Sequence, residues 1–216
     1  MKTRTLITTI AAGGILSVGA LVAIPAFASG PPAGTGPGRD AGSGLMVQGG
    51  MGRGGMNRDG GCLAGVADPS GTLSEAQRTT LAANAEEEKL AHDLYTAFAG
   101  RYDAVVFDRI AGAETAHLNA VRSLMTRYGV TDPTAGQAPG HFTTPAVQAT
   151  YDKLLAQGAS GQAAALEVGR TVETTDIADL RKALDGLTAP DVQRIYQHLL
   201  TASQHHLTAF DNWLAR

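Results

Sequence analysis

Apolar residues recur at helical spacing from Leu73 almost to the C-terminus, and this periodicity limits the fold to packed helices. No stretch of this region alternates in the way that a strand requires. A first helix is expected to begin at a cap on Thr72 or Ser74 and to end near Ala99. The sequence therefore predicts an all-α fold, in which glycine and proline breaks separate the first helix from four others, over residues 103–128, 145–157, 162–184 and 190–214.

The connections between these helices differ in length. Gly100 and Gly186 leave only short joints within the first pair and within the last pair of long helices. A polar link of residues 130–144 follows the second helix, and Pro145 then opens the short helix at the position that a first-turn proline favours. The pattern predicts a four-helix bundle over residues 71–216, with a long crossover between helices two and three that carries the short extra helix.

The first 28 residues have the composition of a secretory signal peptide. Lys2 and Arg4 form a positive n-region, residues 6–26 are an apolar run, and Ala26-Phe-Ala28 is a small-x-small cleavage site. Residues 1–28 are therefore predicted to be a signal peptide, and the mature protein to be secreted, with an uncleaved membrane anchor as the alternative. No second long apolar run follows, which predicts no membrane span after cleavage.

Residues 29–70 are rich in glycine, proline and methionine and have no apolar period, which predicts a flexible tether. Met46, Met51 and Met56 recur every five residues, so copper(I) binding by thioethers is an alternative to simple linker methionines. Cys62 is the only cysteine, so no internal disulfide is expected. We interpret Cys62 as an incidental linker thiol, and leave interchain pairing and ligand binding open.

The charge of the chain argues against a nucleic-acid partner. The formal net charge is −3, and removal of residues 1–28 changes it to about −5. No stripe of Lys and Arg is present to contact phosphates. Nucleophilic hydrolases are not supported either, because the one cysteine lies in the tether and the sequence contains no Gly-x-Ser-x-Gly motif.

Glu114 and His117 are three residues apart in the second predicted helix, so they lie on one helix face and can both reach one metal ion. They flank the direction set by apolar residues that include Ile110 and Leu118. An ionised glutamate in an apolar core is costly unless it is paired or metal-bound. We interpret the two residues as an inward-facing metal-binding motif, with a surface Glu–His pair as the alternative.

The first predicted helix contains the acidic run Glu86-Glu87-Glu88. Consecutive helical residues point in three directions, and a charge run is usually a solvated face. At most one of the three is therefore expected to face the core. Periodicity alone favours Glu87, because Leu90 and Leu94 define a face on which it lies, whereas Glu88 lies on a flank.

The last two long helices supply further candidate ligands. Glu173 and Asp176 are three apart and adjoin apolar positions, and a surface salt bridge is the alternative for Asp176. On the final helix His198, His205 and His206 compete, and His206 shares helical spacing with apolar neighbours. We select His206 as a ligand, although a single buried histidine without metal would give the same pattern.

Carboxylates with one or two imidazoles suit iron or manganese, and suit zinc less well. Two metal ions bridged by carboxylates would neutralise several buried negative charges at once. Such a centre would leave open positions at which dioxygen or peroxide binds.

Four segments carry a resemblance to a known family: Glu86-Glu-Glu-Lys-Leu-Ala-His-Asp-Leu-Tyr95, Glu114-Thr-Ala-His117, Val172-Glu-Thr-Thr-Asp-Ile177 and Ser203-Gln-His-His-Leu207. Through them, residues 73–214 resemble the ferritin-like superfamily of di-iron carboxylate proteins. More closely, they are similar to a bacterial branch described only as a domain of unknown function. The resemblance implies a ferritin-like four-helix bundle that holds two iron ions, with manganese or another divalent metal as the alternative.

The family patterns map onto individual residues. Glu-x-x-Ala-x-x-x-Tyr on the first helix matches Glu88 and Tyr95, and this match favours Glu88 within the acidic run. Glu-x-x-His on the second helix matches Glu114 and His117, and the glutamate of the third helix matches Glu173.

The fourth helix departs from the family pattern. Ser203 stands where the family usually carries glutamate, whereas His206 is retained. Asp176, one turn from Glu173, is a candidate replacement for the missing carboxylate. Without it the site would hold one metal ion, or two that are bound unequally.

Three hypotheses follow from the sequence. The first is an exported metalloprotein that oxidises iron(II) or reduces peroxide, with Tyr95 as a hydrogen-bond partner of the ligands or a radical relay. The second is a non-catalytic protein that binds or buffers metal ions. The third is a structural interaction bundle that binds no metal. The sequence does not determine the oligomeric state, and fold analogy alone does not fix a reaction.

Overall fold

A computed structural model describes residues 71–216. This range contains five helices and no strand: α1 (Glu75–Ala99), α2 (Val106–Tyr128), α3 (Pro145–Gly158), α4 (Gln162–Leu184) and α5 (Pro190–Leu214). The prediction of an all-α fold is confirmed. The predicted signal peptide (1–28) and tether (29–70), with Cys62 and the spaced methionines, lie outside the described residues.

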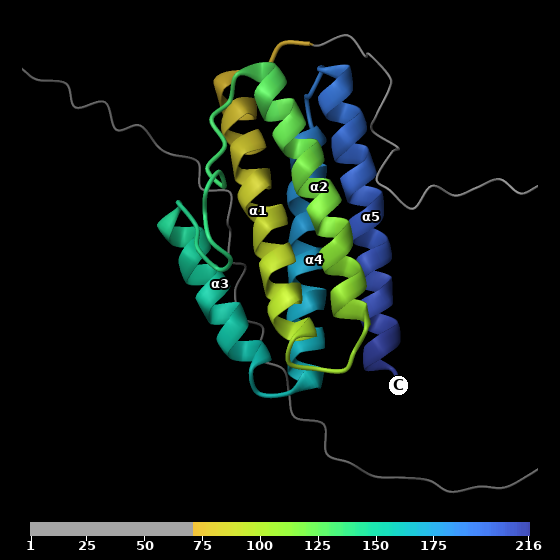
Figure 1. Ribbon diagram of the computed structural model, residues 1–216. Helices are drawn as coiled ribbons and strands as arrows, with labels where there is room; N and C mark the ends of the chain where they lie inside the picture. Colours follow the sequence, from red (N-terminus) through yellow and green to blue (C-terminus); the bar gives the residue numbers. More distant parts are fainter. Residues whose placement is uncertain (1–70) are drawn as a thin grey trace, which may run out of the picture. The chain divides into compact units, whose positions relative to one another are not determined.

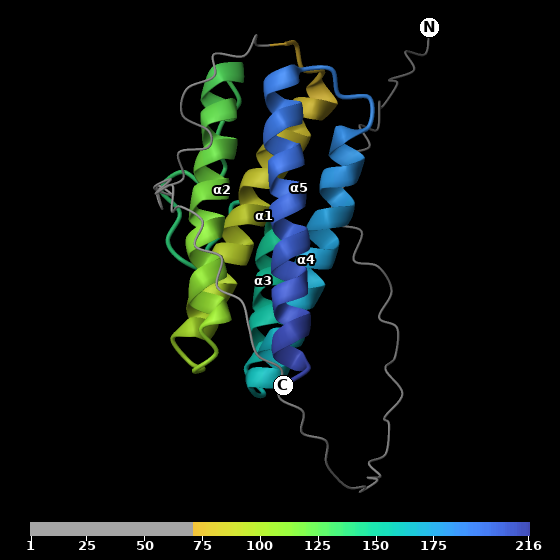
Figure 2. The ribbon, with the colours of Figure 1, turned by 90° about the vertical axis from the view of Figure 1, so that its right-hand side faces the viewer.

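The four long helices pack in two pairs. α1 lies along α2 and α4 lies along α5, while α2 also contacts α5 and α1 also contacts α4. The helices of each pair run in opposite directions, whereas α2 and α4 run in the same direction (Figures 1 and 2). The chain must therefore return along the length of the helices between α2 and α4. It does so through residues 129–161, where α3 packs against α1 and α4, as the predicted crossover requires.

The helix boundaries follow local signals in the sequence. Ser74 caps α1 in a capping box with Gln77. Gly129 ends α2 in the left-handed region at φ 61°, where glycine has no steric penalty. α2 begins at Val106 and not at residue 103 as predicted, since its first backbone hydrogen bond to a carbonyl four residues earlier runs from Arg109 N–H to Val105.

The buried apolar residues form two clusters along the helices. One cluster lies toward the joint between α1 and α2 and includes Tyr95, Phe98, Phe107 and Phe210. The other lies toward the opposite ends and includes Leu81, Val121, Leu180, Tyr196 and Leu199. The helix segments between the clusters contain buried polar residues, which are Glu88, Glu114, His117, Glu173 and Ser203. A polar layer therefore crosses the middle of the core.

The crossover is fastened to α1 by charged side chains. Glu86 accepts hydrogen bonds from the backbone N–H and the hydroxyl of Thr144. Asp93 accepts from the backbone N–H of Gly140 and pairs with Lys89. The face of α1 that carries these residues is therefore covered by residues 138–144 rather than by solvent.

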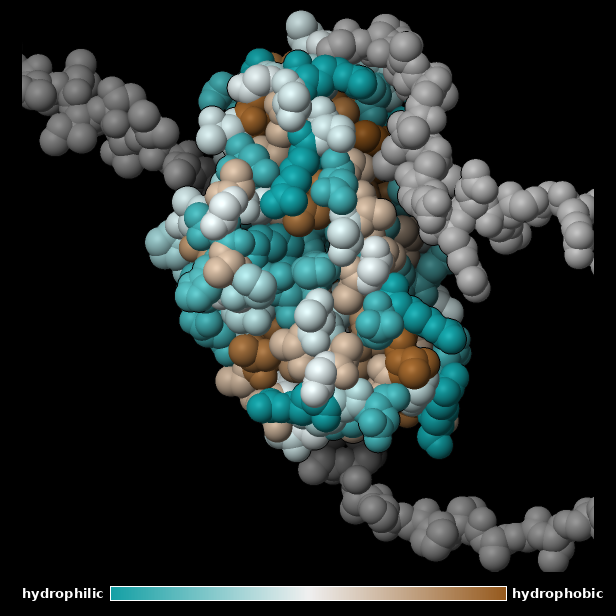
Figure 3. Space-filling model, viewed as in Figure 1, coloured by the Kyte–Doolittle hydropathy of each residue, from teal (hydrophilic) through white to brown (hydrophobic). Residues whose placement is uncertain are grey.

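The surface offers little apolar area for docking. Figure 3 shows hydrophobic residues as small, separate patches on one face. Val105, which is 51% exposed, is the only exposed large apolar side chain between residues 71 and 216. No helix within this range has the length and apolarity needed to span a membrane.

Asp191 links the start of α5 to the end of α2 and gives a first prediction. Its carboxylate accepts hydrogen bonds from Tyr128 (2.6 Å) and Arg127 (2.7 Å). Burial raises the pKa of Asp191, but these bonds outweigh it and hold the pKa below the ordinary 3.8. We expect Asp191→Ala to lower the free energy of unfolding by about 2 kcal/mol near neutral pH. Because the folded-state pKa is depressed, this contribution is present above about pH 4 and is lost as pH falls through the folded-state value.

Urea denaturation of both proteins from neutral pH to about pH 3 measures this contribution. Asp108→Ala is the matched control, since Asp108 lies in the first turn of α2 and is exposed. A constant difference between Asp191→Ala and the unmodified protein across this range would contradict the expected linkage.

Candidate metal centre

The polar layer brings together one or two side chains from each long helix. Glu88 comes from α1, Glu114 and His117 from α2, Glu173 from α4 and His206 from α5. The three carboxylates and His117 are buried, and the His206 side chain is only 12% exposed. Apolar clusters on both sides exclude water from the layer. Charged groups in such surroundings interact strongly with one another.

Glu114 lies at the centre of the layer, because each of its oxygens faces a different imidazole. Its Oε2 is 2.7 Å from His117 Nδ1, and its Oε1 is 2.9 Å from His206 Nδ1. The i, i+3 spacing of Glu114 and His117 accounts for the first contact. The second joins α2 to α5. One carboxylate thus lies between two nitrogen donors.

Glu88 and Glu173 flank this arrangement on opposite sides. Glu88 Oε2 is 3.4 Å from His117 Nδ1, and Glu173 Oε2 is 3.5 Å from His206 Nδ1. The ligand atoms therefore form two sets that share Glu114, each with its atoms within 4.8 Å of one another. The first set contains Glu88, Glu114 and His117, and the second contains Glu114, Glu173 and His206.

Tyr95 fixes the orientation of Glu173. Its hydroxyl, on α1, donates a hydrogen bond of 2.7 Å to Glu173 Oε1. The other oxygen, Oε2, is left facing His206. The Tyr95 ring packs against Phe210 with ring centroids 5.3 Å apart, so its position is set by the neighbouring apolar cluster.

Among the three histidines of α5, only His206 enters the layer. Its ring stacks on His117 with centroids 5.6 Å apart and planes 23° apart. His205 is exposed. His198 is also exposed, and its ring meets His117 edge-on at 6.1 Å. The choice of His206 over its two neighbours thus agrees with its place in the second ligand set.

Asp176 and Ser203 contact each other beside the centre. The Ser203 hydroxyl donates a 2.5 Å hydrogen bond to Asp176 Oδ2. Asp176 therefore reaches the position on α5 where the resemblance expects a carboxylate. It belongs to neither of the two three-ligand sets, and its place as a ligand stays a prediction.

Pairing with the central glutamate dominates the ionisation of the imidazoles. Burial alone would lower the pKa of His117, but its contacts with Glu114 and Glu88 raise that pKa to about 10. Contacts with Glu114 and Glu173 likewise raise the pKa of His206 to about 9 against the effect of burial. Burial would raise the pKa of Glu114, but the two imidazoles lower it to about 2.

The pKa values of the remaining acids of the layer shift in the opposite direction to that of Glu114. Burial, as the largest cause, raises the pKa of Glu88 and of Glu173. Burial and nearby carboxylates raise the pKa of Asp176 to about 7. His206 Nδ1 is buried and makes no hydrogen bond, although the carboxylates of Glu114 and Glu173 lie 2.9 and 3.5 Å from it. Oxygen-rich ligand sets with one imidazole each fit divalent cations.

The acidic run of α1 corrects one prediction. All three carboxylates are removed from solvent, whereas at most one was expected to face the core: Glu86 and Glu88 are 3% and 4% exposed, and both oxygens of Glu87 are buried. Glu88 rather than Glu87 belongs to a possible ligand set, which agrees with the family pattern that favoured Glu88. The buried oxygens of Glu87 agree with periodicity, which places this residue on the face of Leu90 and Leu94.

Comparison with known proteins places the chain in a family. Residues 78–215 match the model of an uncharacterized protein domain, DUF2202. The chain belongs to the DUF2202 family. The uncharacterized protein MJ0754 of Methanocaldococcus jannaschii is 34% identical over 142 residues, which are 66% of this chain and 77% of that protein.

A solved structure agrees with this assignment. The crystal structure of the hypothetical protein MJ0754 from Methanococcus jannaschii matches with a TM-score of 0.68 and 33% identity. The match covers 69% of this chain and 86% of the other. None of these descriptions includes an activity, so the function must be argued from the site.

Proposed function

We propose that this DUF2202 protein holds two divalent metal ions in the polar layer and that Glu114 bridges them. The observation that carries the proposal is the position of the Glu114 carboxylate, with one oxygen toward His117 and the other toward His206. Glu88 and His117 would hold one ion, and Glu173 and His206 the other. Each ion would replace imidazole protons that now balance the carboxylates.

The arrangement of the helices supports a ferritin-like four-helix bundle as the fold. The α1–α2 hairpin supplies Glu88 with Glu114 and His117, and the α4–α5 hairpin supplies Glu173 with His206. Each hairpin thus gives a glutamate from its first helix and an imidazole from its second, which is the pattern of carboxylate centres in such bundles. The crossover through α3 gives the connectivity of this class.

Iron is the metal that this donor set favours, with manganese as the alternative. Bound at these residues, such ions would supply redox chemistry toward dioxygen or peroxide, with iron(II) itself as a candidate electron donor. We therefore propose an oxidase or peroxidase. The predicted export of the chain would place this activity outside the cytoplasm.

The protein's own residues would hold and orient the centre. Tyr95 keeps one oxygen of Glu173 engaged, so the other is presented to the second ion. The stacked His117 and His206 rings hold both Nδ1 atoms toward Glu114. The apolar clusters keep bulk water away, which strengthens the attraction between the carboxylates and a cation.

Metal binding without turnover is the second candidate function. The observation that favours it is Ser203, which stands on α5 where the resemblance expects a carboxylate ligand. The nearest carboxylate, that of Asp176, is already engaged by the Ser203 hydroxyl. Two unequal positions would suit storage or buffering of metal as well as redox chemistry.

Turnover assays separate the two candidates. With excess iron(II) added as the electron donor, we expect the metal-loaded protein to consume peroxide or dioxygen through repeated cycles. The Glu114→Ala/His117→Ala variant should show only the rate of free iron. Glu167→Gln is the control, since Glu167 is an exposed acid of α4 away from the centre. Metal retained by the unmodified protein without turnover would exclude the enzyme and favour the binding protein.

A further inference from the structure

Gly169 is a buried residue on the face of α4 that packs against α5. A Cβ atom at this position would lie 2.6 Å from two carbon atoms of the Phe210 ring and 2.8 Å from a third. Real Cβ atoms do not come this close to other atoms, so α4 and α5 can approach each other here only because position 169 has no side chain. Glycine destabilises a helix interior relative to alanine. The close approach gives a packing reason for its presence within α4.

This contact lies one helical turn from the second ligand set. Gly169 and Glu173 are four residues apart on α4, and His206 and Phe210 are four apart on α5, so each pair shares a helix face. The two helices run in opposite directions (Figures 1 and 2). Their register places Gly169 against Phe210 and Glu173 beside His206, with 3.5 Å between Glu173 Oε2 and His206 Nδ1. The separation of the helices at the glycine therefore also sets the separation of the two ligands.

The Phe210 ring also supports Tyr95, which orients Glu173. Phe210 is fully buried, and the centroid of its ring lies 5.3 Å from that of Tyr95. The Tyr95 hydroxyl donates to Glu173 Oε1 at 2.7 Å. A methyl group at position 169 would push the ring toward Tyr95 or push α5 away from α4. The first response displaces the donor to Glu173, and the second moves His206 away from Glu173.

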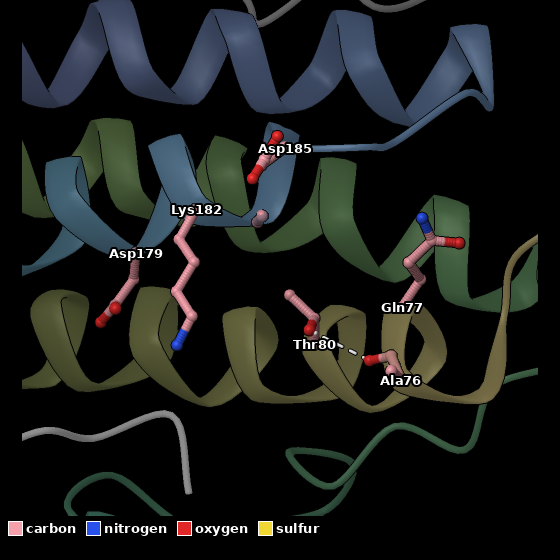
Figure 4. Close-up of a pocket in the computed structure, with 7 residues that line it drawn as sticks. Ala76, Gln77, Thr80, Asp179, Lys182 and Asp185 are labelled. Carbon is pink, nitrogen blue, oxygen red and sulfur yellow. Dashed lines mark hydrogen bonds between the residues drawn. The ribbon is translucent and has the colours of Figure 1, made fainter. Parts of the chain in front are cut away.

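The close approach is local to one part of α4. Near its C-terminal end, α4 instead borders α1 across a groove lined by Ala76, Gln77, Thr80, Asp179, Lys182, Ala183 and Asp185. Figure 4 shows Asp179 and Lys182 extending from α4 toward α1 at this groove. The first ligand set comes from α1 and α2, whereas Gly169 and Phe210 belong to α4 and α5. Their contact is therefore expected to act on the second set alone.

We propose that Gly169 and Phe210 are positioning residues of the second metal position, because their contact holds Glu173 and His206 at the separation that binds a divalent ion. The proposal rests on the metal centre proposed above and adds what sets the geometry of one of its two positions. A methyl group at position 169 should weaken binding there and leave the first position unchanged. Residues that orient metal ligands without touching the metal change affinity by roughly 10–100-fold.

The Co²⁺ affinity of two single-site variants tests this role. Glu88→Ala should retain only the second position, and His206→Ala only the first. Titration of the full chain with Co²⁺ without air, followed by visible absorption, gives the Kd of the position that remains. Added Gly169→Ala is expected to raise this Kd about tenfold or more in Glu88→Ala and to leave it unchanged in His206→Ala. A Kd that is unchanged in both variants, or raised equally in both, would overturn the proposal.

Two other glycine-to-alanine changes in the Glu88→Ala variant separate positioning from a general effect on packing. Gly112 is exposed on α2, and a Cβ atom there would meet nothing within 4 Å. Gly158→Ala on α3 would place a Cβ atom 2.3 Å from the Phe98 ring and so overpack the same apolar cluster from another helix. Both changes should leave the Kd of the second position unaltered. An equal rise in Kd with Gly158→Ala would overturn the proposal, since overpacking alone would then explain the result.

Phe210→Leu removes the ring without adding a clash and covers the case in which Gly169→Ala does not fold. It should also raise the Kd of the second position and not that of the first, and unchanged affinity for both would overturn the proposal. Gly169→Ala should cost less affinity in a Phe210→Leu chain than in one with Phe210, since leucine leaves room for the methyl group. Failure of the unmodified chain to bind Co²⁺ would overturn the metal centre as well, whereas binding that ignores both residues would overturn only their positioning role.

Discussion

Replacement of Glu114 by alanine is expected to remove both metal ions, whereas replacement of His206 is expected to remove one. The difference follows from the geometry. Glu114 belongs to both three-ligand sets, while His206 belongs only to the second. Loss of the shared carboxylate leaves each ion with one carboxylate and one imidazole, and also leaves the buried charges without their common partner. Bound metal should fall from about two ions per chain to about none in Glu114→Ala and to about one in His206→Ala.

The comparison is made by elemental analysis after dialysis against limiting iron(II) or manganese. Glu88→Ala is a useful third variant, because it belongs only to the first set and should also retain one ion. Glu167→Gln is the surface control and should retain both. One ion kept by Glu114→Ala would show that the two positions do not share this carboxylate.

Metal loading should raise the melting temperature of the protein by about 10–20 °C. Each saturated site adds about 2.7 kcal/mol when free metal exceeds its Kd a hundredfold. In a domain of this size, each kcal/mol raises the melting temperature by roughly 2–4 °C. The metal would partner the buried carboxylates Glu88 and Glu173, whose pKa values are raised mainly by burial in its absence. Glu114→Ala/His117→Ala should melt at the same temperature with and without metal.

Calorimetry with and without added metal measures this shift, and a chelator should reverse it. The Asp108→Ala variant, altered at an exposed position in the first turn of α2, serves as the control and should show the full shift. An equal shift in the unmodified protein and in Glu114→Ala/His117→Ala would place the stabilising metal elsewhere on the chain.

The helices were predictable because their signals are local. The cap at Ser74, the left-handed Gly129 and the first-turn prolines Pro145 and Pro190 each act within a few residues. The start of α2 was less predictable, since no side chain caps it and Val105 takes the N-cap position.

The burial of the acidic run of α1 could not be predicted from helical periodicity. Helical periodicity treats one face as buried and the rest as solvated. α1 instead contacts α2, α3 and α4, and the crossover covers a further face. Glu86, Glu87 and Glu88 are therefore all removed from solvent for three different reasons. Each burial results from tertiary contacts of α1, which periodicity does not describe. The choice of Glu88 as a ligand came from the family resemblance and not from periodicity.

Spacing within single helices predicted part of the site. The three-residue separation of Glu114 and His117 was enough to place both on one face. The hydrogen bond between Ser203 and Asp176, by contrast, joins α5 to α4 through two residues that are 27 positions apart in sequence. No local pattern encodes such a contact.

The metal content of residues 29–216 tests the central claim most directly. The protein would be purified without chelator, measured by elemental analysis, and measured again after reconstitution with iron(II) or manganese. A shared Glu114 between two ligand sets predicts about two ions per chain. No bound metal, even after reconstitution, would contradict the account and leave a helical protein whose buried acids and imidazoles pair only with one another.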